Sequence, residues 1–328
     1  MNSLILQKQE EVIALAQFDI KDAVLKKCLL KEDETVITVP DGVTTIGKDA
    51  LCGLQSVIAV TLPESLKVIN DGAFYGCSSL TSVTLPGSVE RLGSCAFAQC
   101  SALNTIYLDN KLTEIGNSAF WGCTSLESID IPAGVTKIGY NLFGSCLSLI
   151  SVSLPDTVTE LDERAFKECT SLACITLPDS LIKIGNMAFL NCHNLKSVNI
   201  PDRLESIGEK AFFMCESLHE LEIPDGIASV GGDAFSDCVS VTVRSTISGK
   251  PLYKAVTATD GSSAYNFILR NIWDKGGFDF TAQDNYFPAL QDENLQYAIA
   301  FSRLMYRVNL SASAEEHYLD FLHNNAEN

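Results

Sequence analysis

The feature that most constrains this chain is a repeat of 23 residues that runs through most of its length. Prolines recur at this step or its multiple, with one interruption at Asp109: Pro40, Pro63, Pro86, Pro132, Pro155, Pro178, Pro201 and Pro224. Phenylalanines keep the step at Phe74, Phe97, Phe120, Phe143, Phe166, Phe189, Phe212 and Phe235. One unit of this size cannot bury its apolar side chains alone. The period therefore predicts a stack of coils, each covering its neighbour.

The first part of each repeat has the pattern of a short strand. In the copy between Leu80 and Cys100, Val83 and Leu85 alternate with polar residues, as in a strand with one buried face. Pro86 ends the strand, because proline has no N–H to donate to a neighbouring strand. We expect parallel pairing between equivalent strands, since it satisfies the backbone hydrogen bonds of every coil.

The second part returns the chain to the next coil. Leu92 belongs to a second extended piece, and Gly93 is expected to permit a tight bend. Ala96, Phe97 and Cys100 have the i, i+1, i+4 spacing of one helical turn with an apolar inner side. About nine such coils, between residues 36 and 245, would form a rod roughly 40 Å long at a strand spacing of ~4.8 Å.

The combined pattern is C-x-x-L-x-x-[VI]-x-[LI]-P-x-x-[VL]-x-x-[IL]-G-x-x-A-F-x-x-C, which resembles the BspA-like leucine-rich-repeat family of bacterial surface antigens. The resemblance implies the α/β repeat class and a right-handed solenoid with a parallel sheet. The pattern covers about two thirds of the chain. It departs at Asp109 for proline, Asn70 and Asp162 for glycine, Leu51 for phenylalanine, Leu54 for cysteine and Leu142 for alanine.

Three domains are expected. Residues 1–35 form a helix or hairpin cap, because residues 18–25 resemble the family's N-terminal hairpin. Residues 36–245 form the solenoid. Residues 246–328 form a small helical domain, with helical patterns over 262–274, 294–306 and 313–323. This last domain caps the final coil or serves as a docking module.

Eight cysteines also follow the 23-residue step: Cys77, Cys100, Cys123, Cys146, Cys169, Cys192, Cys215 and Cys238. We interpret them as a ladder of buried free thiols, each a small apolar residue with a weak S–H donor. Disulfides between rungs are disfavoured, because stacked Cβ atoms stay about 4.8 Å apart and a disulfide needs about 3.8 Å. Zinc is disfavoured because no C-x2-C pair is present.

The chain carries 23 basic and 41 acidic residues and a net charge of −18. This balance argues against nucleic acid and against an anionic membrane surface as partners. No stretch is long enough to span a bilayer. The N-terminus has no basic leader, so we expect no signal peptide. That absence favours the cytoplasm, whereas the family resemblance implies a cell-surface or secreted protein.

No catalytic motif was found, and we expect no enzyme activity, cofactor or small-molecule substrate. The phosphate loop, the dinucleotide fingerprint and the nucleophile elbow are all absent. Acidic residues follow the repeat proline at Asp156, Asp179, Asp202 and Asp225. They could attract calcium, but Pro-Asp more simply suits a turn, so we predict no metal site.

A partner would bind where side chains point outward from the strands. That column reads Thr38, Thr61, Thr84, Tyr107, Asp130, Ser153, Thr176, Asn199 and Glu222. Its small polar residues suit β-structure as well as recognition. We prefer Tyr107 and Asp130 as contacts, because they interrupt the run of Ser and Thr. A second candidate set follows the repeat phenylalanine and includes Tyr75, Trp121 and Phe213, although packing is the more economical explanation for it.

The sequence thus predicts a monomeric protein-interaction scaffold that binds a protein partner of unknown identity on the solenoid surface. An adhesin and an intracellular interaction protein are both compatible with it. The alternatives are an enzyme or docking activity in residues 246–328, with the solenoid as a spacer, or a purely structural role.

Overall fold

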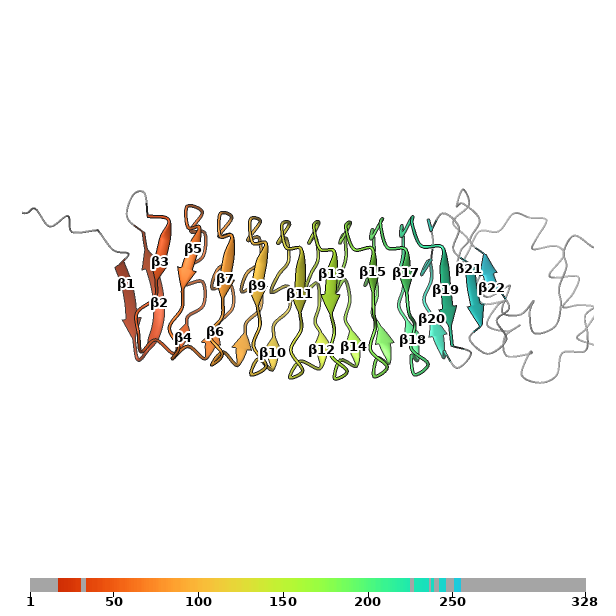
Figure 1. Ribbon diagram of the computed structural model, residues 1–328, viewed down its shortest axis with the longest axis horizontal. Helices are drawn as coiled ribbons and strands as arrows, with labels where there is room; N and C mark the ends of the chain where they lie inside the picture. Colours follow the sequence, from red (N-terminus) through yellow and green to blue (C-terminus); the bar gives the residue numbers. More distant parts are fainter. Residues whose placement is uncertain are drawn as a thin grey trace, which may run out of the picture.

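The computed structural model describes residues 17–30, 34–224, 227–235, 237–238, 242–245 and 251–254. In these residues the chain winds into about nine coils stacked along one axis (Figure 1). Each coil passes through two short strands and a run of turns before it reaches the next coil. The predicted solenoid of 23-residue coils with parallel strands is confirmed.

The first strand of each coil contributes to a row of parallel strands that we call the front sheet. Its strands are β3 (Val36–Thr38), β5 (Ala59–Thr61), β7 (Ser82–Thr84), β9 (Thr105–Tyr107), β11 (Ser128–Asp130), β13 (Ser151–Ser153), β15 (Cys174–Ile175), β17 (Ser197–Val198), β19 (Glu220–Ile223) and β21 (Thr242–Ser245). Equivalent residues pair across coils, as Val83 does with Ile106. Strand pairing is continuous from β3 to β9 and then within the pairs β11–β13, β15–β17 and β19–β21.

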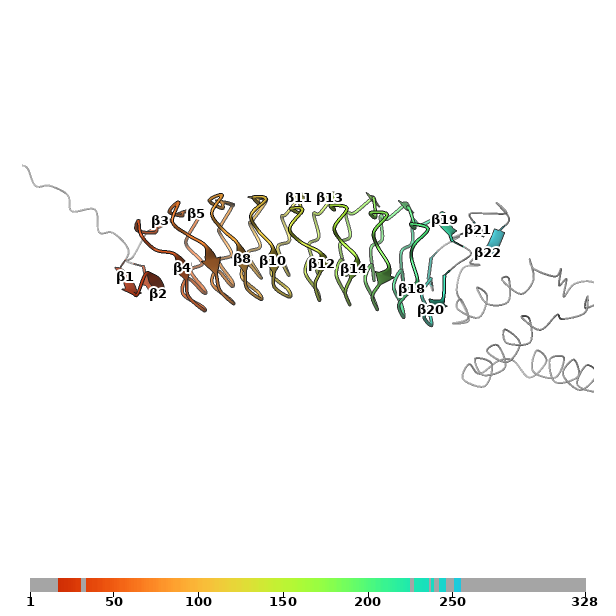
Figure 2. The same ribbon diagram turned by 90° about the horizontal axis from the view of Figure 1, so that it is seen from below.

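The second strand of each coil forms a parallel row that we call the side sheet (Figure 2). Its strands are β4 (Thr45–Ile46), β6 (Val68–Ile69), β8 (Arg91–Leu92), β10 (Glu114–Ile115), β12 (Lys137–Ile138), β14 (Glu160–Leu161), β16 (Lys183–Ile184), β18 (Ser206–Ile207) and β20 (Ser229–Val230). Between the two strands, the repeat proline opens a hydrogen-bonded turn, in which Val89 N donates to Pro86 O at 3.0 Å. Asp109 keeps this turn without proline, since Leu112 N donates to Asp109 O at the same distance.

The third side of each coil is a run of turns that we call the turn row, where the sequence predicts a helical turn. No helix occurs in the described residues. Ala98 N donates to Cys95 O and Cys100 N donates to Phe97 O, which closes successive short turns. Alternate amides bond to the next coil instead: Phe97 N donates to Ala119 O at 2.8 Å. The predicted apolar inner side is present, but its backbone is a series of turns.

Two residues of every turn row have a left-handed backbone, with φ between 51° and 73°. They are Asp49 and Gly53, Gly72 and Gly76, Cys95 and Gln99, Ser118 and Gly122, Asn141 and Ser145, Arg164 and Glu168, Met187 and Asn191, Lys210 and Met214, and Asp233 and Asp237. This conformation costs an ordinary L-residue about 1–2 kcal/mol. The stack therefore imposes a strained backbone on most of these positions.

The repeat phenylalanines and cysteines stack inside the solenoid. Successive phenylalanine rings, from Phe74 to Phe235, have centroids 4.9–5.9 Å apart and planes within 14° of parallel. All twelve cysteines are free, and the eight of the ladder are buried. Each ladder thiol donates to a backbone carbonyl of the preceding coil, as Cys100 Sγ does to Phe74 O at 3.1 Å. The predicted ladder of free thiols is confirmed.

Antiparallel strands lie at both ends of the described solenoid. At the N-terminal end, β1 (Gln17–Lys21) and β2 (Val24–Leu29) form a hairpin, and β2 extends the side sheet by pairing with β4. At the C-terminal end, β22 (Pro251–Lys254) pairs antiparallel with β21. The front sheet thus continues past the domain boundary expected at residue 245. The helical patterns over 262–274, 294–306 and 313–323 lie outside the described residues.

Alkylation distinguishes the two kinds of thiol. Iodoacetamide added to the folded protein should label Cys52 and Cys174, which are exposed, and spare the ladder. Burial raises the pKa of the Cys123 thiol to about 12, and the thiolate is the reactive form. Peptide mass spectrometry measures the labelling, with a urea-unfolded sample as the control in which all twelve should react. Ladder cysteines labelled as fast as Cys174 in the folded protein would contradict the buried ladder.

Glycine is needed at position 93 because the neighbouring coil approaches its backbone closely. This close approach, rather than the tight bend expected from the sequence, accounts for the glycine. A Cβ atom on Gly93 would collide with the backbone nitrogen of Asp71 and lie 2.6 Å from the carbonyl carbon of Asn70. We expect Gly93→Ala to lower the free energy of unfolding by about 1–3 kcal/mol, the usual cost of overpacking. Gly232→Ala is the matched control, because a Cβ there meets nothing within 4 Å. Chemical denaturation measures both, and equal stability of the two variants would refute this role.

The left-handed backbone at Met214 allows a direct measurement of its cost. Met214 has φ of 58° and its side chain is 36% exposed. Met214→Gly and Met214→Ala both remove the side chain, but only glycine adopts this φ without strain. Relief of the strain gains about 1–2 kcal/mol, and the larger backbone entropy of glycine in the unfolded chain costs about 0.5–1 kcal/mol. Met214→Gly should therefore be about 0.5–1 kcal/mol more stable than Met214→Ala. Denaturation midpoints that place the alanine variant at or above the glycine variant would contradict the strain.

Candidate functional site

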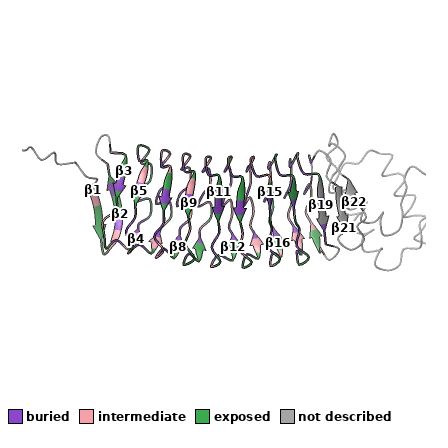
Figure 3. Ribbon diagram, in the orientation of Figure 1, coloured by how far each residue is buried: buried purple, intermediate pink, exposed green. Residues whose placement is uncertain are grey.

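The front sheet presents the column of outward side chains that the sequence predicts. From Thr38 to Asn199, the column members in the described residues are all exposed. The apolar residues between them point into the core, so each front strand from β3 to β17 combines exposed and buried positions (Figure 3). Tyr107 is the most prominent, with 68% of its surface accessible. Glu222 lies in β19, and its side chain is outside the described part of the structure.

Asn199 differs from the other column members, because its amide group is already engaged. Its Oδ1 accepts from Leu177 N at 2.7 Å, and its Nδ2 donates to Leu177 O at 2.8 Å. The side chain thus pairs with the backbone of the preceding coil, where a neighbouring strand would otherwise bond. These two hydrogen bonds give the exposed Asn199 a structural role that the other members of the column do not have.

The second candidate set lies on the turn row, apart from the front sheet. Tyr75 is 38% exposed, whereas Trp121 and Phe213 are half-buried. Trp121 and Phe213 lie two and six coils after Tyr75, and Ala98, in the intervening coil, is fully buried. The structure therefore does not gather these aromatics into one surface with Tyr107.

Three exposed residues near Tyr107 and Asp130 were not selected from the sequence. Ile150 is 55% exposed and Leu147 is 43% exposed, and both lie just before β13. Glu127 is exposed just before β11. The outward column does not identify these three residues, because they lie outside it, in the segment between the ladder cysteine and the front strand of each coil.

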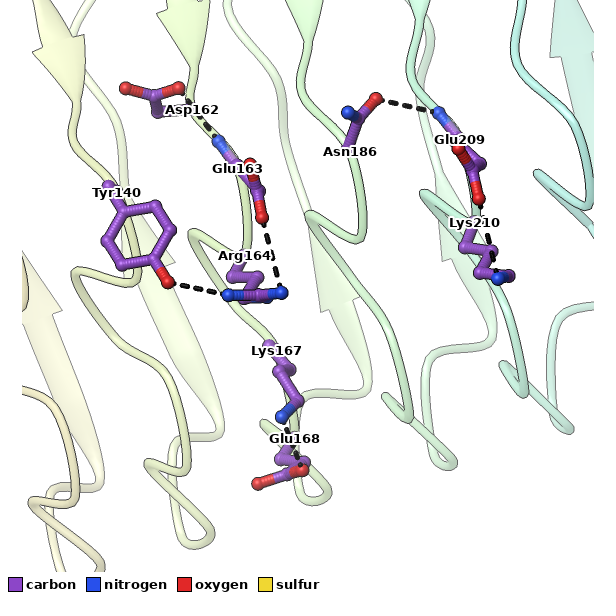
Figure 4. A network of polar contacts seen from close by, with 9 residues as sticks. All are labelled: Tyr140, Asp162, Glu163, Arg164, Lys167, Glu168, Asn186, Glu209 and Lys210. Carbon is purple, nitrogen blue, oxygen red and sulfur yellow. Dashed lines mark hydrogen bonds and ion pairs between the residues drawn. The ribbon is translucent and has the colours of Figure 1, made fainter.

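The densest polar network lies on the turn row and serves the contacts between coils (Figure 4). Arg164 donates to the hydroxyl of Tyr140 at 2.6 Å and forms an ion pair with Glu163 at 3.4 Å. Its guanidinium carbon lies 5.7 Å from the centroid of the Tyr140 ring, a cation–π arrangement. These groups satisfy one another across adjacent coils, so we assign the network to stability.

The other charged pairs of this network are equally satisfied. Lys167 pairs with Glu168 at 3.1 Å, and Lys210 pairs with Glu209 at 3.4 Å. The hydrogen bond that Ser145 donates to Glu168 lowers the pKa of that carboxyl, which holds it in the ionised form. Exposed pairs of this kind contribute at most about 1 kcal/mol each.

The acidic residues after the repeat proline occupy turns. Val158 N donates to Pro155 O at 3.1 Å, which places Asp156 at the second position of a hydrogen-bonded turn. Asp179 has the same place in the next coil, and Asp225 is outside the described residues. Among the described residues no group of three or more His, Cys, Asp or Glu residues is arranged to hold a metal ion. The same part of the chain contains no helix long and apolar enough to cross a bilayer.

Two solved bacterial structures are similar to this one. A leucine-rich repeat protein from Bacteroides ovatus ATCC 8483 aligns with a TM-score of 0.63 and 24% identity, over 72% of this chain and 71% of that chain, which shows a shared fold. A leucine rich cell surface protein from Faecalibacterium prausnitzii A2-165 aligns with a TM-score of 0.56 and 29% identity, over 70% and 74% of the two chains. No curated protein matches this chain.

The repeat itself matches a known family model. The model described as the BspA type leucine rich repeat region (6 copies) matches residues 19–150 and 136–250. The match begins within the N-terminal hairpin and includes the described coils, the same region in which phenylalanines and thiols stack from coil to coil. The chain therefore belongs to the BspA-type leucine-rich-repeat family.

Proposed function

We propose that this chain is a non-catalytic protein-interaction scaffold whose front sheet binds a protein partner. The observation that carries the proposal is the exposed column on the front sheet, with Tyr107 at 68% exposure near its centre. Exposed aromatic residues are enriched among the contacts that dominate binding energy. Repeat solenoids commonly present such extended surfaces to partners.

The rigidity of the stack supports this role. Neighbouring coils are joined by backbone hydrogen bonds on the front sheet, the side sheet and the turn row, as in the bonds of Val39 N to Thr61 O and Phe97 N to Ala119 O. The strands of such a rigid frame lose little backbone entropy when a partner binds. Less of the favourable contact energy is then offset, and the affinity is higher. An extended, ordered surface therefore suits recognition of another protein.

The cellular location of the binding is a further part of the proposal. The similar protein from Faecalibacterium prausnitzii is described as a cell surface protein. We propose a surface-directed role of the adhesin type by that likeness, with a partner on another cell or in its matrix.

Affinity capture with matched variants tests the proposal. Thr84→Arg combined with Thr176→Arg places two cations on the front sheet, at exposed positions with no side-chain bond that would be lost. Thr136→Arg combined with Thr159→Arg makes the same chemical change near the side sheet, where both residues are exposed. The immobilised full chain should retain a partner from extracts of neighbouring cells and matrix. Quantitative mass spectrometry should show that partner lost with the first pair and kept with the second.

Two outcomes would contradict the front sheet as the binding surface. One is a partner retained equally by both double variants. The other is a partner lost with the side-sheet pair and retained with the front-sheet pair. Circular dichroism of both variants serves as the control for folding.

A further inference from the structure

Two columns of the repeat depart from their Ser and Thr residues near the centre of the front sheet. The outward column is Ser or Thr in most coils: Thr38, Thr61, Thr84, Ser153 and Thr176. It changes to Tyr107 and Asp130 in two adjacent coils. The position that follows the ladder cysteine is Ser or Thr in four of its eight coils: Ser78, Ser101, Thr124 and Thr170. It changes to Leu147 one coil further on. Because neighbouring coils fold with Ser or Thr at these places, the fold does not require the substituted residues.

Some departures elsewhere on these columns have contacts within the solenoid. Asn199 pairs through its amide with the backbone of Leu177. His193 and Glu216 follow their ladder cysteines and face each other, with Nδ1 and Oε1 3.4 Å apart. The described residues show no side-chain hydrogen bond or ion pair for Tyr107, Asp130 or Leu147, so these three substitutions need another explanation.

Five exposed residues from three successive coils make up what we call the central patch: Tyr107, Glu127, Asp130, Leu147 and Ile150. Tyr107 ends β9, Asp130 ends β11, and Ile150 precedes β13, so three successive coils contribute. Two strand spacings place its outer coils about 10 Å apart, and three residues place Glu127 and Ile150 about 10 Å along the chain from the outward column. Leu147 lies three residues before Ile150. Such dimensions suit the insertion of one or two partner side chains.

The patch combines exposed apolar side chains with unpaired acid. Tyr107, Leu147 and Ile150 are 68%, 43% and 55% exposed. Glu127 and Asp130 have no ion-pair partner in the described part of the chain, in contrast to the paired acids of the turn row. Large apolar side chains held in water gain free energy when a partner covers them. Unpaired carboxylates beside them favour a partner that brings a cation.

We propose that the central patch is the contact point of the front sheet for a protein segment that presents a Lys or Arg next to an apolar side chain. The cation pairs with Glu127 and Asp130, and the apolar side chain packs on Tyr107, Leu147 and Ile150. This inference rests on the proposed function and names the chemistry of its partner. The net charge of −18 adds a long-range attraction for such a segment.

A displayed library of random linear peptides, selected on the full-length protein, tests the chemistry. We expect enriched sequences to carry Lys or Arg beside an aromatic or aliphatic residue. An enriched peptide is then synthesised with a fluorescent label, and its dissociation constant is measured by fluorescence anisotropy. Its binding should weaken as salt is raised, because the carboxylates at the sheet surface are screened.

Variants that place Thr, a residue found at equivalent positions of other coils, locate the contact without endangering the fold. Glu127→Thr combined with Asp130→Thr should weaken the peptide at least about tenfold and remove most of the salt dependence. Leu147→Thr combined with Ile150→Thr should weaken it by a similar factor and leave the salt dependence. Thr136→Ser combined with Thr159→Ser is the control, because both residues are exposed near the side sheet, and it should leave binding unchanged.

The outcomes separate this inference from the proposed function. Enrichment of acidic or uncharged peptides, or affinity unchanged by both patch variants, overturns the central patch. A peptide that ignores these variants and is lost with Thr84→Arg and Thr176→Arg overturns the patch and leaves the front sheet as the binding surface. A selection that enriches no sequence over the patch variants also overturns the inference, while partner capture by the full chain still decides the proposed function.

Discussion

The structure depends on the hydrogen bonds that join each coil to the next at a step of 23 residues. These bonds occur on all three sides of the coil, from strands on two sides and from alternate amides of the turn row on the third. Their spacing holds equivalent residues within about one strand separation of each other. A residue that fits its place in one coil must therefore fit against its own equivalent above and below. The parallel phenylalanine rings and the unbridged thiol ladder are direct results of this constraint.

The same constraint explains what the sequence could and could not predict about the fold. The recurrence of Phe97 and Cys100 at equivalent positions of eight coils predicts that these side chains stack, whatever conformation the local backbone adopts. The backbone between them was mispredicted as a helical turn, because an i, i+1, i+4 spacing places side chains on one side of a short series of turns as well. Cys95 and Gln99 adopt a left-handed backbone that their residue types do not indicate. Only tertiary hydrogen bonds select that conformation over a helix.

The strained positions show that cooperativity between coils outweighs local preference. A left-handed residue costs about 1–2 kcal/mol alone, and most coils contain two of them. Each turn row forms several hydrogen bonds with its neighbours, and from the second coil onward it buries a phenylalanine and a cysteine. Burial of one such aromatic contributes about 1.5–3 kcal/mol. A coil with glycine at these positions, such as that of Gly72 and Gly76, avoids the strain, and coils with larger residues retain it without losing the fold.

The functional surface of such a repeat protein is harder to predict from the sequence than its core is. The outward column was predictable from strand alternation, and Tyr107 and Asp130 are visible as interruptions of Ser and Thr. Glu127 and Ile150 were not, since their position in the coil has no common residue from which to depart. Asn199 shows the opposite difficulty, because an interruption that bonds to the backbone of Leu177 looks the same in sequence as one that faces a partner. Within a repeat, then, an unusual exposed residue indicates function only once its own contacts are known to leave it free.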